Sequence, residues 1–97
     1  MLSIDEIKTN LRAIKPYMTS VYNIDNLYIF GSYTRGEQTS KSDIDILVDF
    51  KTTPDLLTFI EIEEFLSEKL HAKVDLIPKR KLKHQLKKHI LSEAIAI

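Results

Sequence analysis

A short, entirely apolar run ends at the first of the chain's two glycines, and this junction constrains the fold more than any other feature. Leu27-Tyr28-Ile29-Phe30 consists of strand-forming residues and is followed directly by Gly31. A continuous apolar run predicts a strand that is buried on both faces. Gly36 follows closely, and glycine is used where the backbone takes a positive φ or approaches a ligand. The sequence therefore predicts a buried strand that opens into a turn with exposed backbone N–H groups, which suits phosphate oxygens. A simple strand-ending turn is the alternative, and for Gly31-Ser32 taken alone it is the favoured interpretation.

Apolar spacing before this turn predicts an amphipathic helix at the start of the chain. Ser3 and Glu6 form a capping-box pattern, in which each side chain meets a backbone N–H of the other residue. The helix is expected over 4–14, and Pro16 is expected to end or kink it before it resumes as far as Tyr22.

The remaining pattern predicts two further strands and two further helices. The strands are expected over 43–50 and 73–77, and the helices after Thr53-Pro54, with Thr53 as N-cap, and over 81–93. Ile95-Ala96-Ile97 is an apolar end that could extend along another element. The expected fold class is therefore α/β (α+β), a small mixed three-stranded sheet with helices packed on it.

Length and composition indicate one domain over residues 1–97. The chain has 43% hydrophobic and 29% charged residues, which is enough apolar material for a core of its own. It has no cysteine, which excludes disulfides, thiolate zinc sites and cysteine nucleophiles. No apolar run approaches the ~20 residues that span a bilayer, and the start of the chain lacks a signal-peptide pattern. We therefore expect a cytoplasmic protein that does not enter a membrane.

Fourteen basic and fourteen acidic residues give no net charge, so composition does not favour direct nucleic-acid binding. The charges are nonetheless segregated, because 37–68 is mainly acidic and 69–89 is mainly basic. The basic segment 79–89 is interpreted by default as a solvated helix face. Docking against an acidic partner, or against RNA, is left open.

Asp43 and Asp45 open the second expected strand. Residues two apart in a strand point to the same face, so their carboxylates are expected side by side. Like charges at this separation resist ionisation unless a cation lies between them, and converging carboxylates suit Mg²⁺. Simple solvent exposure is the alternative, although aspartate is depleted in strands. Asp49, on the same alternation, is interpreted as a surface charge at the far end of the strand.

Asp75 is the only acid within 69–89 and lies between apolar residues of the third expected strand. If that strand neighbours the strand of Asp43, a third carboxylate joins the same face. Three carboxylates around two metal ions about 3.5–4 Å apart are the arrangement used for phosphoryl transfer. An ion pair with a nearby lysine on a solvated face is the alternative.

These elements together resemble a known family. Gly31-Ser32, ten intervening residues and Asp43-Ile44-Asp45 are similar to the signature of the polymerase-β-like nucleotidyltransferase superfamily. The longer strings 30–36 and 42–50 resemble its minimal branch, the MNT-type antitoxins encoded beside HEPN-domain toxins. The resemblance covers nearly the whole chain, with no departure at these motif positions.

The resemblance implies two groups of site residues. Gly31 and Ser32 would hold the triphosphate of ATP or another NTP. Arg35 would steady the phosphates or the loop, although a solvated loop cation is an equal alternative. Tyr33 is the one tyrosine that could lie near the nucleotide.

The second group is the carboxylates. Asp43, Asp45 and Asp75 would be catalytic and would bind metal, with two Mg²⁺ ions expected. Asp75 would also favour deprotonation of the acceptor hydroxyl.

The family's chemistry is transfer of a nucleoside monophosphate from an NTP with release of pyrophosphate. In the antitoxin branch AMP passes to a tyrosine hydroxyl of the partner HEPN toxin and silences it. The chain has no room for a domain that grips the acceptor, so a hetero-oligomer or homodimer is expected. Two alternatives remain: a catalytically vestigial antitoxin that neutralises its toxin by binding, and a subunit of a small-molecule (aminoglycoside-type) nucleotidyltransferase.

Overall fold

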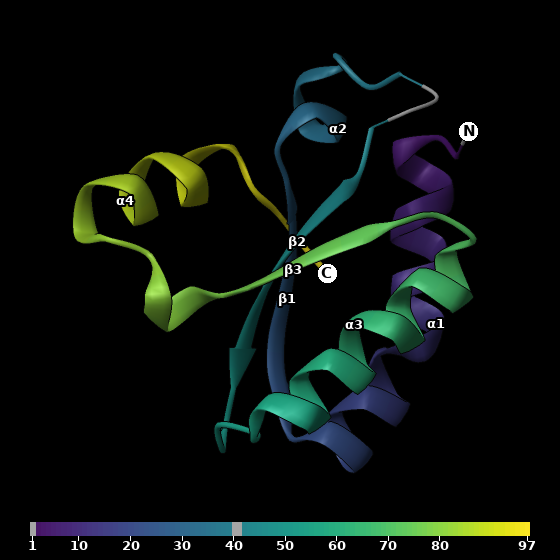
Figure 1. The fold of residues 1–97 in the computed structure, drawn as a ribbon. Coiled ribbons are helices and arrows are strands. Elements are labelled where there is room, and N and C mark those ends of the chain that lie inside the picture. The colour runs from purple at the N-terminus through teal and green to yellow at the C-terminus, as the bar shows by residue number, and fades with distance from the viewer. Residues whose placement is uncertain (1, 40–41) are drawn as a thin grey trace.

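Helices and strands alternate through the part of the chain that the computed structural model describes, residues 2–39 and 42–97 (Figure 1). The element order is α1 (Ile4–Tyr22), β1 (Ile24–Phe30), α2 (Ser32–Arg35), β2 (Ile44–Phe50), α3 (Leu56–Leu70), β3 (Val74–Pro78), the 3₁₀ helix η1 (Lys79–Lys81), α4 (His84–Glu93) and β4 (Ile95–Ala96). The expected α/β class is confirmed. None of the described helices is long and apolar enough to cross a membrane.

The strands form one mixed sheet in the order β3-β2-β1-β4. β1 is antiparallel to both β2 and β4, whereas β2 and β3 are parallel. The described residues thus give four strands where the sequence predicted three. The additional strand forms because Ile95 pairs with Ile29, and the Ile97 N–H donates to the Leu27 carbonyl at 2.9 Å.

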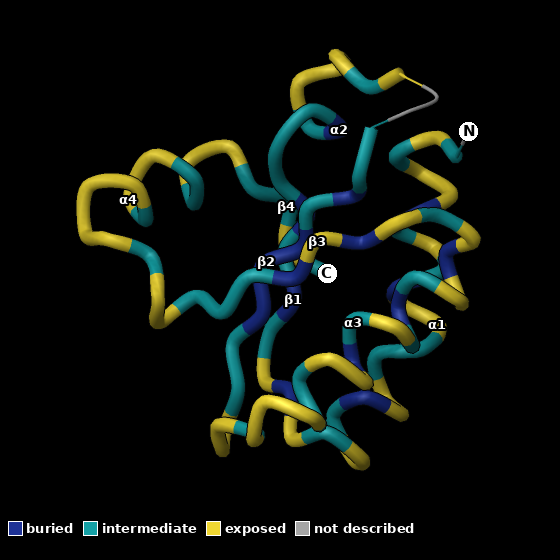
Figure 2. Tube along the Cα trace, viewed as in Figure 1, coloured by how far each residue is buried: buried dark blue, intermediate teal, exposed yellow. Residues whose placement is uncertain are grey.

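Helices α1 and α3 cover one face of this sheet, and the core lies between them and the strands (Figures 1 and 2). The side chains that fill it recur at helical spacing in α1 and α3 and at alternate positions in the strands. Its fully buried members include Ile7, Leu11, Met18, Leu27, Ile29, Ile44, Ile46, Ile62, Leu66 and Leu70. Because Ile44 and Ile46 point into this core, Asp45 points to the opposite face of the sheet.

Helix α1 begins as predicted but does not break at its proline. The Ser3 hydroxyl accepts from the Glu6 N–H at 3.1 Å, and Glu6 accepts from the Ser3 N–H at 3.2 Å. Pro16 lies inside one continuous helix. The turn after it is held against α3, because Tyr17 stacks on Phe65 with ring centroids 5.3 Å apart. This packing offsets the backbone hydrogen bond that proline removes.

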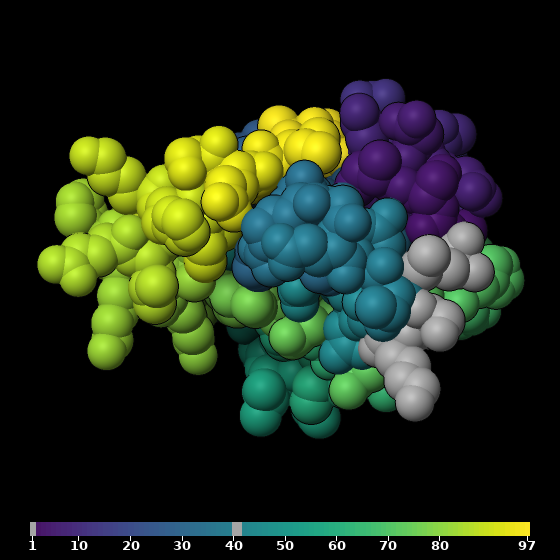
Figure 3. All heavy atoms as spheres, turned by 90° about the horizontal axis from the view of Figure 1, so that it is seen from above, coloured from purple at the N-terminus to yellow at the C-terminus, as the bar shows by residue number. Residues whose placement is uncertain are grey.

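Two predicted helix boundaries were wrong. Helix α3 is capped by Asp55 rather than Thr53, since the Asp55 carboxylate accepts from the Thr58 N–H at 2.8 Å. The expected helix over 81–93 is divided, because Leu82 and Lys83 are extended between η1 and α4. None of the residues of α4 is buried, and the helix projects from the body of the molecule (Figures 1 and 3).

Candidate functional site

Gly31 links β1 to α2 in a conformation that other residues avoid. Its φ is +81° and its ψ is −149°, a region that is essentially restricted to glycine. A Cβ atom at this position would also collide with a carboxylate oxygen of Asp45 on the neighbouring strand. The positive φ predicted for this glycine is therefore present, and the group that would meet a side chain here is a carboxylate of the chain itself.

The turn after Gly31 is fixed by its own residues. Thr34 donates to the Gly31 carbonyl twice, from its N–H at 3.1 Å and from its hydroxyl at 2.8 Å. Tyr33 is only 4% exposed and belongs to the hydrophobic core. The buried Tyr33 side chain anchors the turn to the core. Ser32 is half-buried at the first position of α2, directly after Gly31.

The parallel pairing of β2 with β3 brings two of the candidate aspartates together. Asp45 and Asp75 are register partners, and neighbouring strands lie about 4.8 Å apart. Asp45 is half-buried and Asp75 is exposed. Asp43 lies directly before β2 and is half-buried. The condition on which the Asp75 prediction depended, that its strand neighbours the second strand, is satisfied.

The electrostatics of Asp45 reflect this crowding. Its pKa is raised above the ordinary value, first by burial, then by the charge of Asp75 and that of Asp43, while Arg35 acts in the opposite direction. Burial and like charges both disfavour the ionised carboxylate. A cation bound among these carboxylates would remove the repulsion, so the donor set suits a hard divalent ion such as Mg²⁺.

The carboxylates do not, however, converge on one point. Within residues 2–39 and 42–97 no group of three or more acidic, histidine or cysteine side chains is placed to hold a metal ion. Asp43 instead has the Lys73 ammonium 3.7 Å from its Oδ2. The aspartates are close enough to repel one another, and they would have to turn toward a common centre to share an ion.

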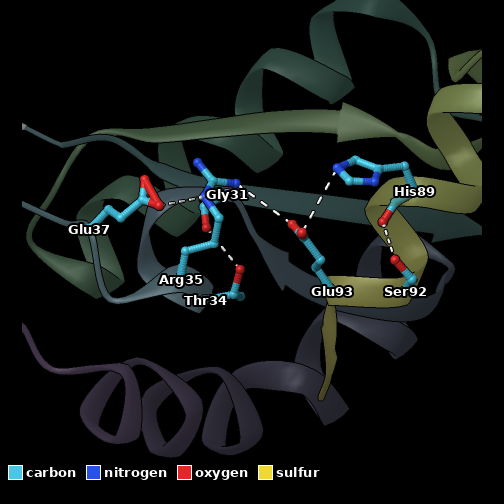
Figure 4. Close-up of polar contacts among 7 residues, drawn as sticks. All are labelled: Gly31, Thr34, Arg35, Glu37, His89, Ser92 and Glu93. Carbon is cyan, nitrogen blue, oxygen red and sulfur yellow. Dashed lines mark hydrogen bonds and ion pairs between the residues drawn. The ribbon is translucent and has the colours of Figure 1, made fainter.

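Arg35 lies between two carboxylates (Figure 4). Its Nε is 3.3 Å from an oxygen of Glu37, in the same loop, and its NH1 is 3.7 Å from an oxygen of Glu93, at the end of α4. Glu93 also has the His89 Nε2 at 3.8 Å. Arg35 is thus held by ion pairs rather than by water alone. No sequence pattern indicated the roles of Glu93 and His89, because both lie far from Arg35 along the chain.

Asp49 is a partly exposed charge near the far end of β2, as predicted, and it has two partners. Its Oδ2 accepts from the Asn26 amide at 3.4 Å and lies 3.9 Å from the Lys79 ammonium. The Lys79 ammonium also lies 5.3 Å from the centre of the Tyr28 ring. Asp49 therefore fixes η1 against the sheet, away from the other aspartates.

Comparison with known proteins identifies the family. Residues 12–97 match the family model described as "Polymerase beta, Nucleotidyltransferase". The chain belongs to this nucleotidyltransferase family. The expectation from the Gly31-Ser32 and Asp43-Ile44-Asp45 motifs is confirmed.

Two relatives of this nucleotidyltransferase match it over their full or nearly full length. The protein adenylyltransferase MntA of Thermococcus cleftensis is 42% identical, over all of this chain and 98% of its own. A protein of Methanocaldococcus jannaschii that is provisionally named a protein adenylyltransferase is 48% identical, with both chains fully covered.

Solved structures agree with the sequence relatives. One that is provisionally described as a minimal nucleotidyltransferase superposes with a TM-score of 0.85 at 27% identity, covering 99% of this chain and 97% of the other. A toxin–antitoxin structure with AMP-PNP has a TM-score of 0.73 at 29% identity, covering 90% of this chain and 70% of that one. The fold of this nucleotidyltransferase is therefore that of the minimal branch.

Proposed function

We propose that this chain is a metal-dependent protein adenylyltransferase that acts as an antitoxin, moving AMP from ATP to a tyrosine hydroxyl of a HEPN-domain toxin. The observation that carries the proposal is the register pair of Asp45 and Asp75, directly beside the Gly31 turn. Relatives of similar length named protein adenylyltransferase support it. We place the reaction in the cytoplasm, where ATP and Mg²⁺ are supplied.

In this proposal the chain's own residues position the reactants. The Gly31 turn and the Ser32 hydroxyl hold the triphosphate, and Arg35 contacts the phosphates after leaving one of its carboxylate partners. Asp75, exposed at the edge of the site, faces the acceptor hydroxyl and favours loss of its proton. Positioning and charge stabilisation are the main contributions that a protein makes to phosphoryl transfer.

The covalent step is a displacement at the α-phosphorus of ATP. The proton of the tyrosine hydroxyl passes to the Asp75 carboxylate as the tyrosine oxygen forms a bond to the α-phosphorus. The bond from that phosphorus to the oxygen bridging to the β-phosphate breaks, and pyrophosphate leaves. Asp43, Asp45 and Asp75 would hold the Mg²⁺ ions, which when bound activate the attacking oxygen and stabilise the leaving one.

A partner toxin is expected because structural relatives are described as toxin–antitoxin complexes. One of them is a tri-AMPylated HEPN toxin of Shewanella oneidensis in complex with its MNT antitoxin. For this chain we propose a hetero-oligomer with a HEPN-domain toxin, in which the toxin supplies the acceptor tyrosine.

The test is the intact mass of a HEPN-domain protein encoded next to the gene for this chain, after incubation with the chain, Mg²⁺ and ATP. We expect a gain of one or more AMP units with the wild type and none with Asp43→Asn. Asp49→Asn is the matched control, since Asp49 lies on the same strand but contacts Asn26 and Lys79. An unchanged toxin mass, with a stable complex still formed, would contradict the enzyme and favour neutralisation by binding alone.

A further inference from the structure

The structure has a hollow at the end of the sheet that lies opposite the aspartates. Its volume is about 250 Å³. Phe50, at the end of β2, and Pro78, at the end of β3, line it from the sheet, and Phe59 lines it from α3. Asp45 and Asp75, by contrast, lie near the start of the same two strands. The hollow is therefore separate from the candidate site.

Apolar side chains beside this hollow are unusually exposed. Among the described residues Leu57, at 79%, and Leu56, at 73%, are the most exposed large hydrophobic side chains, and Ile60 follows one turn later at 41%. Leu56 also lines the hollow. Several exposed apolar side chains on the first turns of one helix, next to a concave pocket, are typical of protein interfaces, in which a partner's side chain fills the pocket.

The charges around the hollow are mainly positive. Arg80 and Lys81 line it, and neither forms an ion pair with any residue that the structure describes. The one carboxylate in the lining belongs to Asp55, which accepts the Thr58 N–H as the cap of α3. This hydrogen bond lowers the pKa of Asp55. The unpaired cations complement an acidic partner.

We propose that the partner toxin docks on one surface at the start of α3, called the α3-start surface. It consists of the hollow, the exposed apolar side chains of Leu56, Leu57 and Ile60, and the cations Arg80 and Lys81. The toxin inserts an apolar side chain into the hollow and presents carboxylates to the two cations. The identity of this partner rests on the proposed function. The apolar lining favours a polypeptide over RNA, which would be bound through phosphates and stacked bases.

The α3-start surface lies far from the candidate site, so docking and catalysis would use different residues. Phe50 follows Asp45 by five positions on β2, which corresponds to about 17 Å at ~3.4 Å per residue. One folded toxin domain can span this distance, because a domain of ~100 residues has a radius of gyration of about 13 Å. Changes at the α3-start surface should therefore alter affinity for the toxin while leaving ATP binding unchanged.

The experiment compares two exposed leucines. The affinity of the toxin for the wild type, Leu57→Ser and Leu86→Ser is measured by titration calorimetry, and Mg·ATP affinity is measured for each chain. Leu86 is the matched control because it is 53% exposed on α4, away from the hollow. We expect Leu57→Ser to weaken toxin binding at least tenfold, and Leu86→Ser to change it less than twofold, with Mg·ATP affinity equal in all three.

A charge variant gives an independent readout. Arg80→Glu should slow association with the toxin and reduce its dependence on salt, because the rim charge steers the encounter. Arg12→Glu, an exposed cation on α1, is the control.

Several outcomes would overturn the proposal. These are unchanged toxin affinity in Leu57→Ser, a larger loss in Leu86→Ser, or no binding of toxin by the wild type. If Leu57→Ser instead dissociates a homodimer of this chain and leaves toxin binding intact, the surface belongs to a second copy. Loss of binding in Leu57→Ser alongside a wild type that transfers no AMP would support the docking site and contradict only the proposed function.

Discussion

Arg35 at the end of α2 and Glu93 at the end of α4 form an ion pair, with 3.7 Å between NH1 of the arginine and Oε2 of the glutamate. The pair joins α2, which follows Gly31, to α4. Both side chains are more than a third exposed, so its contribution to stability is about 0–1 kcal/mol. The pair also holds the Arg35 guanidinium near Glu93, and a phosphate of ATP would compete with Glu93 for this guanidinium.

Glu93→Gln should lower the KM for ATP. The change removes a carboxylate that competes with phosphate for Arg35, and we expect a decrease of about two- to fivefold, the effect of a surface ion pair of ~0.4–1 kcal/mol. Steady-state kinetics of AMP transfer measures it. His89→Gln is the control, since it removes the other partner of Glu93 and leaves the Arg35 pair in place. A KM that rises, or one that falls equally in both variants, would show that Glu93 does not compete with phosphate.

Asp45→Asn should stabilise the protein when no divalent ion is present. The folded state raises the pKa of Asp45 through burial and the charges of Asp75 and Asp43, so its ionised form destabilises the fold at neutral pH. Because Asp45 is only half-buried and solvent screens its charge, we expect a gain of no more than about 0.5 kcal/mol, or roughly 2–4 °C in Tm, measured by thermal denaturation with EDTA. Asp49→Asn should not be stabilising, because that carboxylate accepts from Asn26.

The raised pKa of Asp45 also predicts how the free energy of unfolding changes with pH. Because the folded-state pKa of Asp45 is raised, the folded state binds the proton more tightly than the unfolded state between the two pKa values. The stabilisation from Asp45 is complete at pH values below the pKa of the unfolded state. It is lost as the pH rises through the pKa of the folded state. Urea denaturation of the wild type and Asp45→Asn across mildly acid pH should give free energies of unfolding that converge as the pH falls. A difference that is constant with pH would contradict this explanation.

Gly31→Ala should be far more damaging than Gly36→Ala. An added Cβ at Gly31 meets the Asp45 carboxylate, whereas at Gly36 it meets nothing within 4 Å. Both glycines have positive φ. Backbone strain costs about 1–2 kcal/mol at Gly36, which is in the left-handed α conformation. At Gly31, in the region that other residues avoid, it costs about 1–3 kcal/mol. The collision adds to this at Gly31 and displaces Asp45. Denaturant titration should show the larger loss for Gly31→Ala, together with loss of transfer, and equal losses would indicate that Asp45 moves away without cost.

Mg²⁺ should stabilise the wild type by binding to the folded chain. At about ten times its Kd, a ligand that binds only the folded state adds ~1.4 kcal/mol to the free energy of unfolding. Thermal denaturation with and without Mg²⁺ should show this increase for the wild type and not for Asp75→Asn. The increase should persist in Asp49→Asn. An increase in the free energy of unfolding that persists in Asp75→Asn would show that Mg²⁺ binds elsewhere.

Local patterns predicted the elements better than their ends. The Ser3 and Glu6 capping box and the apolar spacing that follows it were enough to place α1. The N-cap of α3 was missed because Thr53-Pro54 and Asp55 both fit a helix start, and the choice depends on which side chain reaches the Thr58 N–H. The strand β4 was missed because two residues carry little pattern of their own, and pairing with β1 determines their conformation.

The candidate residues could be named from the sequence, but their contacts could not. Gly31, Asp43, Asp45 and Asp75 were proposed from residue type and spacing. In the structure Asp45 lies beside Gly31 and pairs in register with Asp75, and Asp43 lies directly before β2. The pairing of Arg35 with Glu93 could not be predicted, since it depends on how the C-terminal segment folds back beside β1. Long-range contacts between exposed charges have no periodic signature.

The parallel pairing of β2 with β3 also affects when the site can form during synthesis. Domains are made from the N-terminus onward, so a nascent chain that has emerged only as far as α3 already contains Asp43 and Asp45 but has no β3 to pair with. A parallel pair also requires a crossover, here α3, and such long-range contacts form slowly. The three aspartates can meet only after α3 has folded back and β3 has docked. Truncated or stalled translation products would therefore lack a complete site.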